Sequence, residues 1–235
     1  MPLKSVTEAK SRLVPLLSPP QRADLMRAMV TDVLAALCQL GHRCRVQVLL
    51  GAGWDSETLA GPNITCTSED GYAATGFNDL LSQVLAESAS RHRLVVFADL
   101  PLLTPAGLSE LMTVLEERHP VICPDRASAG TNILGIPAGC SVVTRYGLHS
   151  FQRHVAGLAD HAVQVKSSTA TGLDIDTPED LALLAALDRS EGTLQAGHAT
   201  RAWLAGQALP EACQSGVVAT LAESGTAGWP LGIAS

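Results

Sequence analysis

Apolar residues recur along the chain in two different periods, and these periods predict its secondary structure. A spacing of three and four residues indicates amphipathic helices, whereas short unbroken apolar runs are typical of strands buried on both faces of a sheet. Helices are expected over about 19–40, 77–85, 105–115, 150–158 and 178–187, and strands over 44–50, 94–98, 121–123, 132–136, 162–165 and 173–175. Because strands and helices alternate, the chain is predicted to be an α/β protein with a mainly parallel sheet.

Local signals support the starts of two of these helices. Residues 18–21 (SPPQ) combine a capping box with prolines in the first turn, and residues 177–180 (TPED) repeat the pattern. The amino-acid composition changes after Asp188: no lysine follows, and Ala, Gly and Ser are frequent. We therefore expect a domain over 1–188 and an extension over 189–235, with a helix over about 199–209 and no assigned function.

The size and charge of the chain exclude several classes of protein. Its 235 residues are 46% hydrophobic, as expected of one globular domain. The net charge of −7 and the 3% of aromatic residues argue against a nucleic-acid binder. No apolar run approaches the ~20 residues of a membrane span, and the N-terminus does not resemble a secretory signal. A cytoplasmic protein is therefore expected. Its six cysteines form no C-x-x-C pair and are expected to be reduced thiols.

Three cations near the N-terminus, Lys4, Lys10 and Arg12, lie in a polar segment ahead of the first helix. Fixed cations and backbone N–H groups are what a polyphosphate requires. The alternative is a solvated basic segment without a ligand.

Three aspartates are placed as metal ligands would be. Asp99 directly follows the apolar run 94–98, and ligands bind beyond the carboxyl ends of parallel strands. Asp174 and Asp176 share one face of an extended segment, and carboxylates so close repel unless a cation lies between them. Carboxylate oxygens with substrate phosphates typically hold Mg²⁺. Alternatively, Asp99 caps a turn, Asp176 leads into a helix and Asp174 faces solvent.

Two loops, 124–132 and 146–150, are glycine-containing corners with hydroxyl groups that can approach an anion. His149 and His154 are expected to be surface or packing residues. The chain lacks a dinucleotide-binding glycine fingerprint, a P-loop and a G-x-S-x-G elbow, which disfavours those enzyme classes.

Five segments in order resemble one family. The segments are PLKSVTEAKSRL (2–13), VVFADLPLL (95–103), CPDRASAGTN (123–132), RYGLHSFQRH (145–154) and LDIDTPEDL (173–181). The family is that of the guanylyltransferases of coenzyme F-420 biosynthesis, which act on 2-phospho-L-lactate or phosphoenolpyruvate. The resemblance covers roughly residues 2–187.

The resemblance implies a Rossmann-like, glycosyltransferase-A-type sheet with helices on both faces. It also implies that GMP moves from GTP to the phosphate of a small three-carbon acid, with release of pyrophosphate. 3-Phospho-D-glycerate is a third candidate acceptor. By position, the family's Mg²⁺ ligands match Asp99, Asp174 and Asp176, and its acceptor contacts match Thr131, Gly147 and Ser150. The family's GTP-phosphate contacts match Lys10 and Arg12, with Lys4 beside them, and its guanosine contact matches Asn78. The expected catalytic residues are Lys10, Arg12 and Asp99.

One departure concerns the first strand. Members of the family usually carry a few apolar residues before the I-P-x-K stretch, whereas this sequence begins Met1-Pro2-Leu3-Lys4, so a truncated first strand is expected. The alternatives are another nucleotidyltransferase, such as a molybdopterin guanylyltransferase, whose G-G-x-S-x-R loop is missing, and a non-catalytic nucleotide-binding homologue. The oligomeric state stays open, and the alanine-rich tail is compatible with a homodimer interface.

Overall fold

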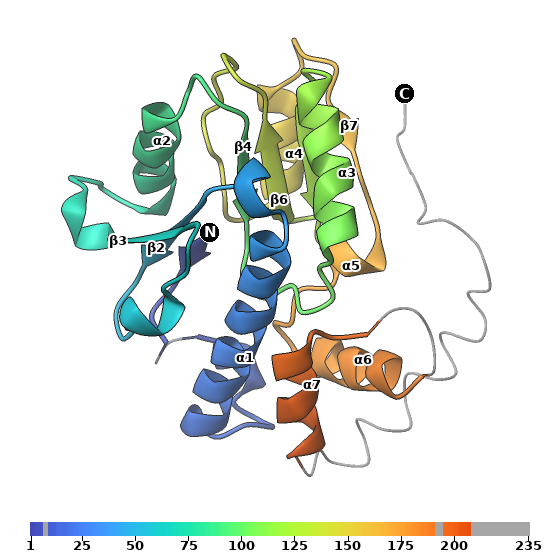
Figure 1. The fold of residues 1–235 in the computed structure, drawn as a ribbon. Coiled ribbons are helices and arrows are strands. Elements are labelled where there is room, and N and C mark those ends of the chain that lie inside the picture. The colour runs from blue at the N-terminus through green and yellow to red at the C-terminus, as the bar shows by residue number, and fades with distance from the viewer. Residues whose placement is uncertain (7–8, 191–194, 208–235) are drawn as a thin grey trace.

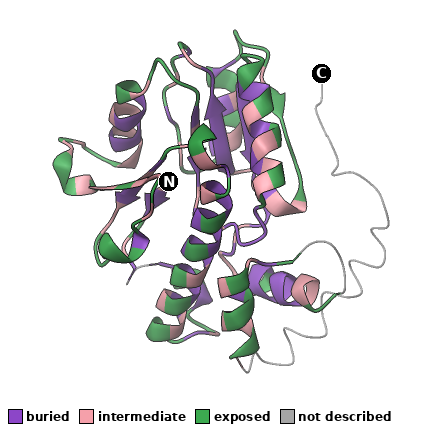
Figure 2. Cartoon of the chain, in the orientation of Figure 1, coloured by how far each residue is buried: buried purple, intermediate pink, exposed green. Residues whose placement is uncertain are grey.

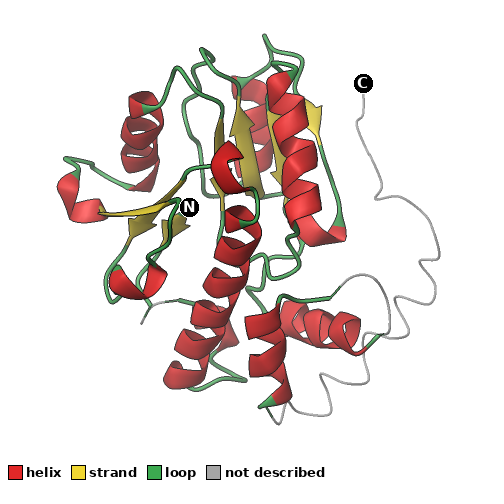
Figure 3. Cartoon of the chain, in the orientation of Figure 1, coloured by secondary structure: helices red, strands yellow, loops and turns green. Residues whose placement is uncertain are grey.

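A computed structural model describes residues 1–6, 9–190 and 195–207 of the chain (Figure 1). Most of the predicted C-terminal extension, residues 208–235, therefore lies outside the described residues. Within the described ranges, strands alternate with helices as the sequence predicts (Figure 3). No helix there combines the length and apolar character needed to cross a membrane.

The strands form two sheets. The first is parallel throughout and has the order β1-β2-β3, with β1 at Pro2–Leu3, β2 at Val46–Leu50 and β3 at Ile64–Ser68. The second has the order β4-β6-β5-β7, with β4 at Arg93–Val96, β5 at Val121–Pro124, β6 at Thr131–Ile136 and β7 at Gln164–Val165. β6 runs antiparallel to β4 and β5, whereas β5 and β7 are parallel. Three of the five strand pairings among the described residues are thus parallel.

Six of the described α-helices begin and end close to the predicted positions, and a short one at Thr169–Gly172 was not predicted. They are α1 (Pro19–Cys38), α2 (Phe77–Glu87), α3 (Pro105–Glu116), α4 (Ser150–Gly157), α5 (Thr169–Gly172), α6 (Pro178–Arg189) and α7 (His198–Ala205), with short 3-10 helices at Ser11–Leu13, Gly41–Arg43, Glu57–Leu59 and Glu69–Gly71. Both predicted capping boxes are present, at the starts of α1 and α6. A reciprocal cap satisfies backbone N–H groups that the first helical turn leaves unpaired.

Helices cover both faces of the sheets, as expected. One apolar cluster joins α1, α3 and α6 to inward residues such as Val48 and Val96. A second cluster joins α2 and α4 to the opposite face, through residues such as Leu49 and Val95. Neighbouring residues of one strand enter different clusters because side chains alternate across a sheet. Buried residues accordingly concentrate in the strands and in the inward helix faces (Figure 2).

The predicted strand over 173–175 is wrong. This segment follows the short helix α5 and pairs with no strand, and one backbone bond, from the Ile175 N–H to the Asp99 carbonyl at 3.2 Å, ties it to the end of β4. Its apolar residues are buried against the core from a loop, a pattern that periodicity does not distinguish from a strand. The sequence reading also missed β3, whose residues ITCTS are half exposed and mostly polar.

Two terminal features bear on the expectations above. β1 is only two residues long and pairs in parallel with the end of β2. At the other end, α7 packs against α1, and the buried carboxylate of Asp32 accepts the N–H groups of Ala199 and Thr200 at 2.9 and 2.8 Å. The described part of the extension is therefore docked on the domain.

Candidate active site

Three aspartates from two distant parts of the chain meet beyond the end of β4. Asp99 follows that strand by three residues, and Asp174 and Asp176 lie in the loop between α5 and α6. Each offers one carboxylate oxygen, and these oxygens lie within 4.8 Å of one another. All three side chains are partly accessible. The loop and the strand end are held together by the Ile175–Asp99 backbone bond.

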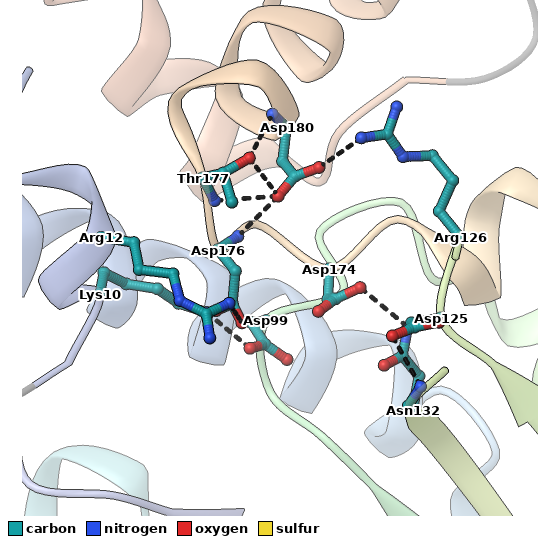
Figure 4. A network of polar contacts seen from close by, with 11 residues as sticks. Lys10, Arg12, Asp99, Asp125, Arg126, Asn132, Asp174, Asp176, Thr177 and Asp180 are labelled. Atoms are coloured by element: carbon teal, nitrogen blue, oxygen red, sulfur yellow. Dashed lines mark hydrogen bonds and ion pairs between the residues drawn. The ribbon is translucent and has the colours of Figure 1, made fainter. Parts of the chain in front are cut away.

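The Lys10 ammonium contacts two of these carboxylates, those of Asp99 and Asp176 (Figure 4). Its Nζ donates to Asp99 Oδ2 at 2.5 Å and to Asp176 Oδ1 at 2.8 Å, and the side chain is 5% exposed. Burial opposes the charged form, but the two carboxylates outweigh it and raise the pKa of Lys10 above its usual value. The Lys10 backbone has φ of +57°, a left-handed conformation that non-glycine residues rarely adopt and that often marks a functional position.

The two aspartates of the loop have opposite environments. Burial raises the pKa of Asp174 to about 6, and the charge of Asp99 adds to the shift. Asn132 opposes it by donating from Nδ2 to Asp174 Oδ1 at 3.2 Å. Burial also acts on Asp176, but the charge and hydrogen bond of Lys10, together with the charges of Arg12 and Lys4, outweigh it and lower the pKa of that carboxyl. A positive charge near Asp174 would therefore relieve the repulsion that remains in the cluster.

Asn132 is a site residue that sequence reasoning passed over. Its amide bridges β6 to the aspartate loop, since Nδ2 also faces the carbonyls of Thr171 and Gly172 at 3.1 and 3.3 Å. Its position beside Thr131, in a segment already selected for chemistry, was the available signal. The Asn132 amide therefore helps to fix the position of the Asp174 carboxylate.

A second set of contacts supports the loop that carries Asp176. Asp180 accepts the N–H groups of Asp176 and Thr177 at 3.2 and 2.9 Å, and it pairs with Arg126 at 2.9 Å (Figure 4). Asp125 accepts the N–H groups of Ala129 and Gly130, both at 2.8 Å. These bonds fix the two loops that flank the aspartates.

The other predicted cations are more open. Arg12 lies 3.8 Å from Asp176 and its side chain is 73% exposed. Lys4 contributes a weaker positive field at Asp176. Both therefore border the cluster from the solvent side, where an anionic ligand would approach.

Two of the residues matched to acceptor contacts are in direct contact. Ser150, the first residue of α4, donates from Oγ to Thr131 Oγ1 at 3.4 Å, and both residues are buried. Gly147 joins this corner because its carbonyl accepts the Ser150 N–H at 3.1 Å, and it has φ of +116°. Thr131 directly precedes Asn132 on β6, so one strand contributes a residue to this corner and a residue that contacts Asp174.

Asn78 holds the same corner from the other side. Its Oδ1 accepts the Tyr146 N–H at 2.7 Å and its Nδ2 donates to the Tyr146 carbonyl at 3.0 Å. The side chain thus fixes the backbone next to Gly147, and a contact with the nucleotide stays a prediction.

Comparison with known sequences agrees with the motif reading. A family model described as "Guanylyl transferase CofC like" matches residues 1–193. A phosphoenolpyruvate guanylyltransferase of Sphaerobacter thermophilus is 31% identical over 190 residues, covering 79% of this chain and 90% of that protein. A 2-phospho-L-lactate guanylyltransferase of Methanosarcina mazei is 31% identical over 175 residues, covering 74% of this chain and 79% of that protein.

Comparison with solved structures concerns the fold alone. A protein from Desulfovibrio desulfuricans G20, whose crystal structure is described as that of a nucleotide-diphospho-sugar transferase, superposes with a TM-score of 0.72. The two share 17% identity, over 87% of this chain and 91% of that one. The predicted α/β architecture is thereby confirmed.

Proposed function

The chain belongs to the CofC-like guanylyl transferase family, and from that premise we propose that it moves GMP from GTP to the phosphate of a small three-carbon acid. The family implies a place in coenzyme F-420 biosynthesis. The observation that carries the proposal is the cluster of Asp99, Asp174 and Asp176, in which Asp99 and Asp176 contact the Lys10 ammonium. It combines, at one strand end, the cation and the metal-ligating oxygens that two phosphorylated substrates need.

The chemistry of the three carboxylates fits a Mg²⁺ ion. Mg²⁺ prefers oxygen ligands and usually combines one or two protein carboxylates with substrate phosphates. Asp99, Asp174 and Asp176 offer such oxygens within 4.8 Å of one another while remaining accessible. When bound, the ion would offset phosphate charge and stabilise the charge that develops on the leaving pyrophosphate.

The chain's own cations would orient the triphosphate. Lys10 is held by two carboxylates, so it presents a fixed charge rather than a mobile one. Arg12 and Lys4 lie on the open side of the cluster, where they would neutralise phosphate groups outside it. Fixed cations placed where negative charge accumulates lower the barrier most, because they need not reorganise during the reaction.

The acceptor would bind at the corner of Thr131, Gly147 and Ser150. One of its phosphate oxygens attacks the α-phosphorus of GTP, a new P–O bond forms, and the bond to the β-phosphate breaks to release pyrophosphate. The attacking oxygen is already ionised near neutral pH, so no protein base is required. The main task is alignment, and oriented binding supplies about 7 kcal/mol or more of such a barrier.

The test is pyrophosphate release from GTP and Mg²⁺, with phosphoenolpyruvate, 2-phospho-L-lactate and 3-phospho-D-glycerate supplied separately. Release is expected with one acid, with GTP but not with ATP or CTP, and not after chelation of the metal. The proposal would be contradicted by a folded sample that binds GTP but releases no pyrophosphate with any of the three acids.

A further inference from the structure

The start of α7 lies against the backbone segment that carries Asp99. The Gly197 N–H donates to the Pro101 carbonyl at 2.9 Å, two residues beyond that aspartate. Ala196, next to Gly197, is 5% exposed and belongs to the apolar cluster that joins α1, α3 and α6. The family model matches residues 1–193, so this contact is made by a part of the chain outside the matched domain.

Two backbone bonds tie the segment that follows β4 to distant parts of the chain. The Asp99 carbonyl accepts the Ile175 N–H at 3.2 Å, from the loop that carries the other two aspartates. The Pro101 carbonyl accepts the Gly197 N–H from the start of α7. Leu100, between the two carbonyls, is fully buried. A segment held by few such bonds opens locally when one of them is lost, and the bond from α7 therefore helps to set where Asp99 lies.

Asp32 of α1 fixes the start of α7. Its buried carboxylate accepts the Ala199 N–H at 2.9 Å and the Thr200 N–H at 2.8 Å. The first N–H groups of a helix have no partner within the helix, and a negative charge beside them is favourable. A Cβ atom at Gly197 would overlap the Asp32 carboxyl group. The absence of a side chain at this position allows α7 to begin close to α1 (Figure 1) and its N–H to reach Pro101.

We propose that the start of α7 is a positioning element for the aspartate cluster, with Asp32 and Gly197 as positioning residues that keep Asp99 within reach of Asp174 and Asp176. The inference rests on the proposed function, which assigns a divalent cation to the three carboxylates. Mg²⁺ demands near-ideal octahedral geometry, so a small displacement of one ligand weakens binding. Contacts that orient metal ligands without touching the ion typically contribute 10–100-fold to metal affinity.

The experiment compares the full chain with Asp32→Ala and Gly197→Ala, each of which releases the start of α7. Binding of Mn²⁺, which prefers the same oxygen ligands as Mg²⁺, is measured without substrates from the electron paramagnetic resonance signal of the free ion. The Kd is expected to rise about tenfold or more in both variants. Amide exchange at Ile175 should become about tenfold faster, while exchange at Phe97, which donates to the Asn132 carbonyl, should change much less.

Two controls separate positioning from a general loss of stability. Ile136→Val removes one methyl group from a fully buried residue of β6 in the second apolar cluster, so it destabilises the fold without touching α7. Arg201→Met removes an ion pair with Asp188 further along α7, where the arginine side chain is 48% exposed. Both controls should bind Mn²⁺ as the unchanged chain does.

The inference would be overturned if Asp32→Ala and Gly197→Ala left both the Kd for Mn²⁺ and the exchange at Ile175 unchanged. A rise in Kd of the same size in Ile136→Val would overturn it too, because the effect would then reflect stability alone. An unchanged chain that binds no Mn²⁺ would refute the metal assignment of the proposed function, and this inference with it.

Discussion

His154 and Thr131 are joined by a hydrogen bond whose direction the structure determines. The Arg145 backbone N–H donates to His154 Nε2 at 2.9 Å, so this nitrogen carries no proton. In the neutral ring the proton is then on Nδ1, which lies 2.9 Å from Thr131 Oγ1 and donates to it. Ser150 donates to the same oxygen at 3.4 Å. The Thr131 hydroxyl proton is left to donate elsewhere, as an acceptor phosphate would require.

Replacing this histidine should weaken binding of the acceptor acid. In His154→Phe the ring stays but both hydrogen bonds are lost, so Thr131 is free to rotate away from its donor orientation. We expect the KM for the acid to rise about tenfold, the loss of roughly one hydrogen bond to a charged group, with the KM for GTP within twofold of the unchanged protein. An equal rise in the KM for the acid and the KM for GTP would instead indicate a general structural defect.

The same histidine should make stability depend on pH. Burial lowers the pKa of His154 from 6.5 to about 4 in the folded protein. Because the unfolded chain binds the proton more readily, the stabilisation is complete above pH 6.5 and is lost progressively as the pH falls towards 4. The difference corresponds to at most about 3 kcal/mol. Urea unfolding should be measured from pH 7 to pH 4 for the unchanged protein and for His154→Phe. The free energy of unfolding should fall more steeply with decreasing pH in the unchanged protein.

The aspartate cluster should be required for turnover and not for the fold. Asp99→Ala and Asp174→Ala are each expected to reduce kcat by a factor of about 100 or more, since each removes a proposed ligand of the metal. Their circular dichroism spectra should match that of the unchanged chain. Asp24→Ala is a matched control, because the Asp24 side chain is 60% exposed and, among the described residues, forms an ion pair only with Arg27. Full activity in either cluster variant would refute the metal assignment.

Lys10 should contribute to stability as well as to activity. Lys10→Met leaves the Asp99 and Asp176 carboxylates without the cation that both contact, which should cost about 3 kcal/mol in urea unfolding, the lower end for a broken buried pair. Millimolar Mg²⁺ should restore part of this loss. Arg12→Met, at an exposed position, should change stability by less than about 1 kcal/mol. Equal losses in the two variants would contradict the central position of Lys10.

Asp32 should anchor α7 to α1. Its carboxylate accepts two N–H groups at the start of α7, and a side chain at Gly197 would overlap it. Asp32→Ala is therefore expected to destabilise the protein by about 1–2 kcal/mol and to speed amide exchange across 198–205. Thr31→Ala, on the exposed side of the same helix, serves as the control. Unchanged exchange in the Asp32 variant would show that α7 is held by its apolar contacts alone.

Most helices and buried strands were predictable because the required signals are local. The capping boxes at residues 18–21 and 177–180 place helix starts where the structure has them. β3 was missed because its side chains alternate weakly and stay half exposed. The antiparallel direction of β6 was not predictable either, since a buried strand shows the same apolar run whichever way its neighbours point.

By itself, the sequence determined the fold class and the family and predicted the aspartates and cations of the site, because hydrophobic period and motif order can be read from residues close together in the chain. Only the tertiary structure decided that Lys10 is the cation enclosed by the carboxylates, through contacts spanning 89 and 166 residues. It likewise assigned Asn132 and His154 to their partners. Such pairings depend on which side chains are brought together when strands and helices pack. Patterns among residues close in the sequence do not specify these long-range contacts.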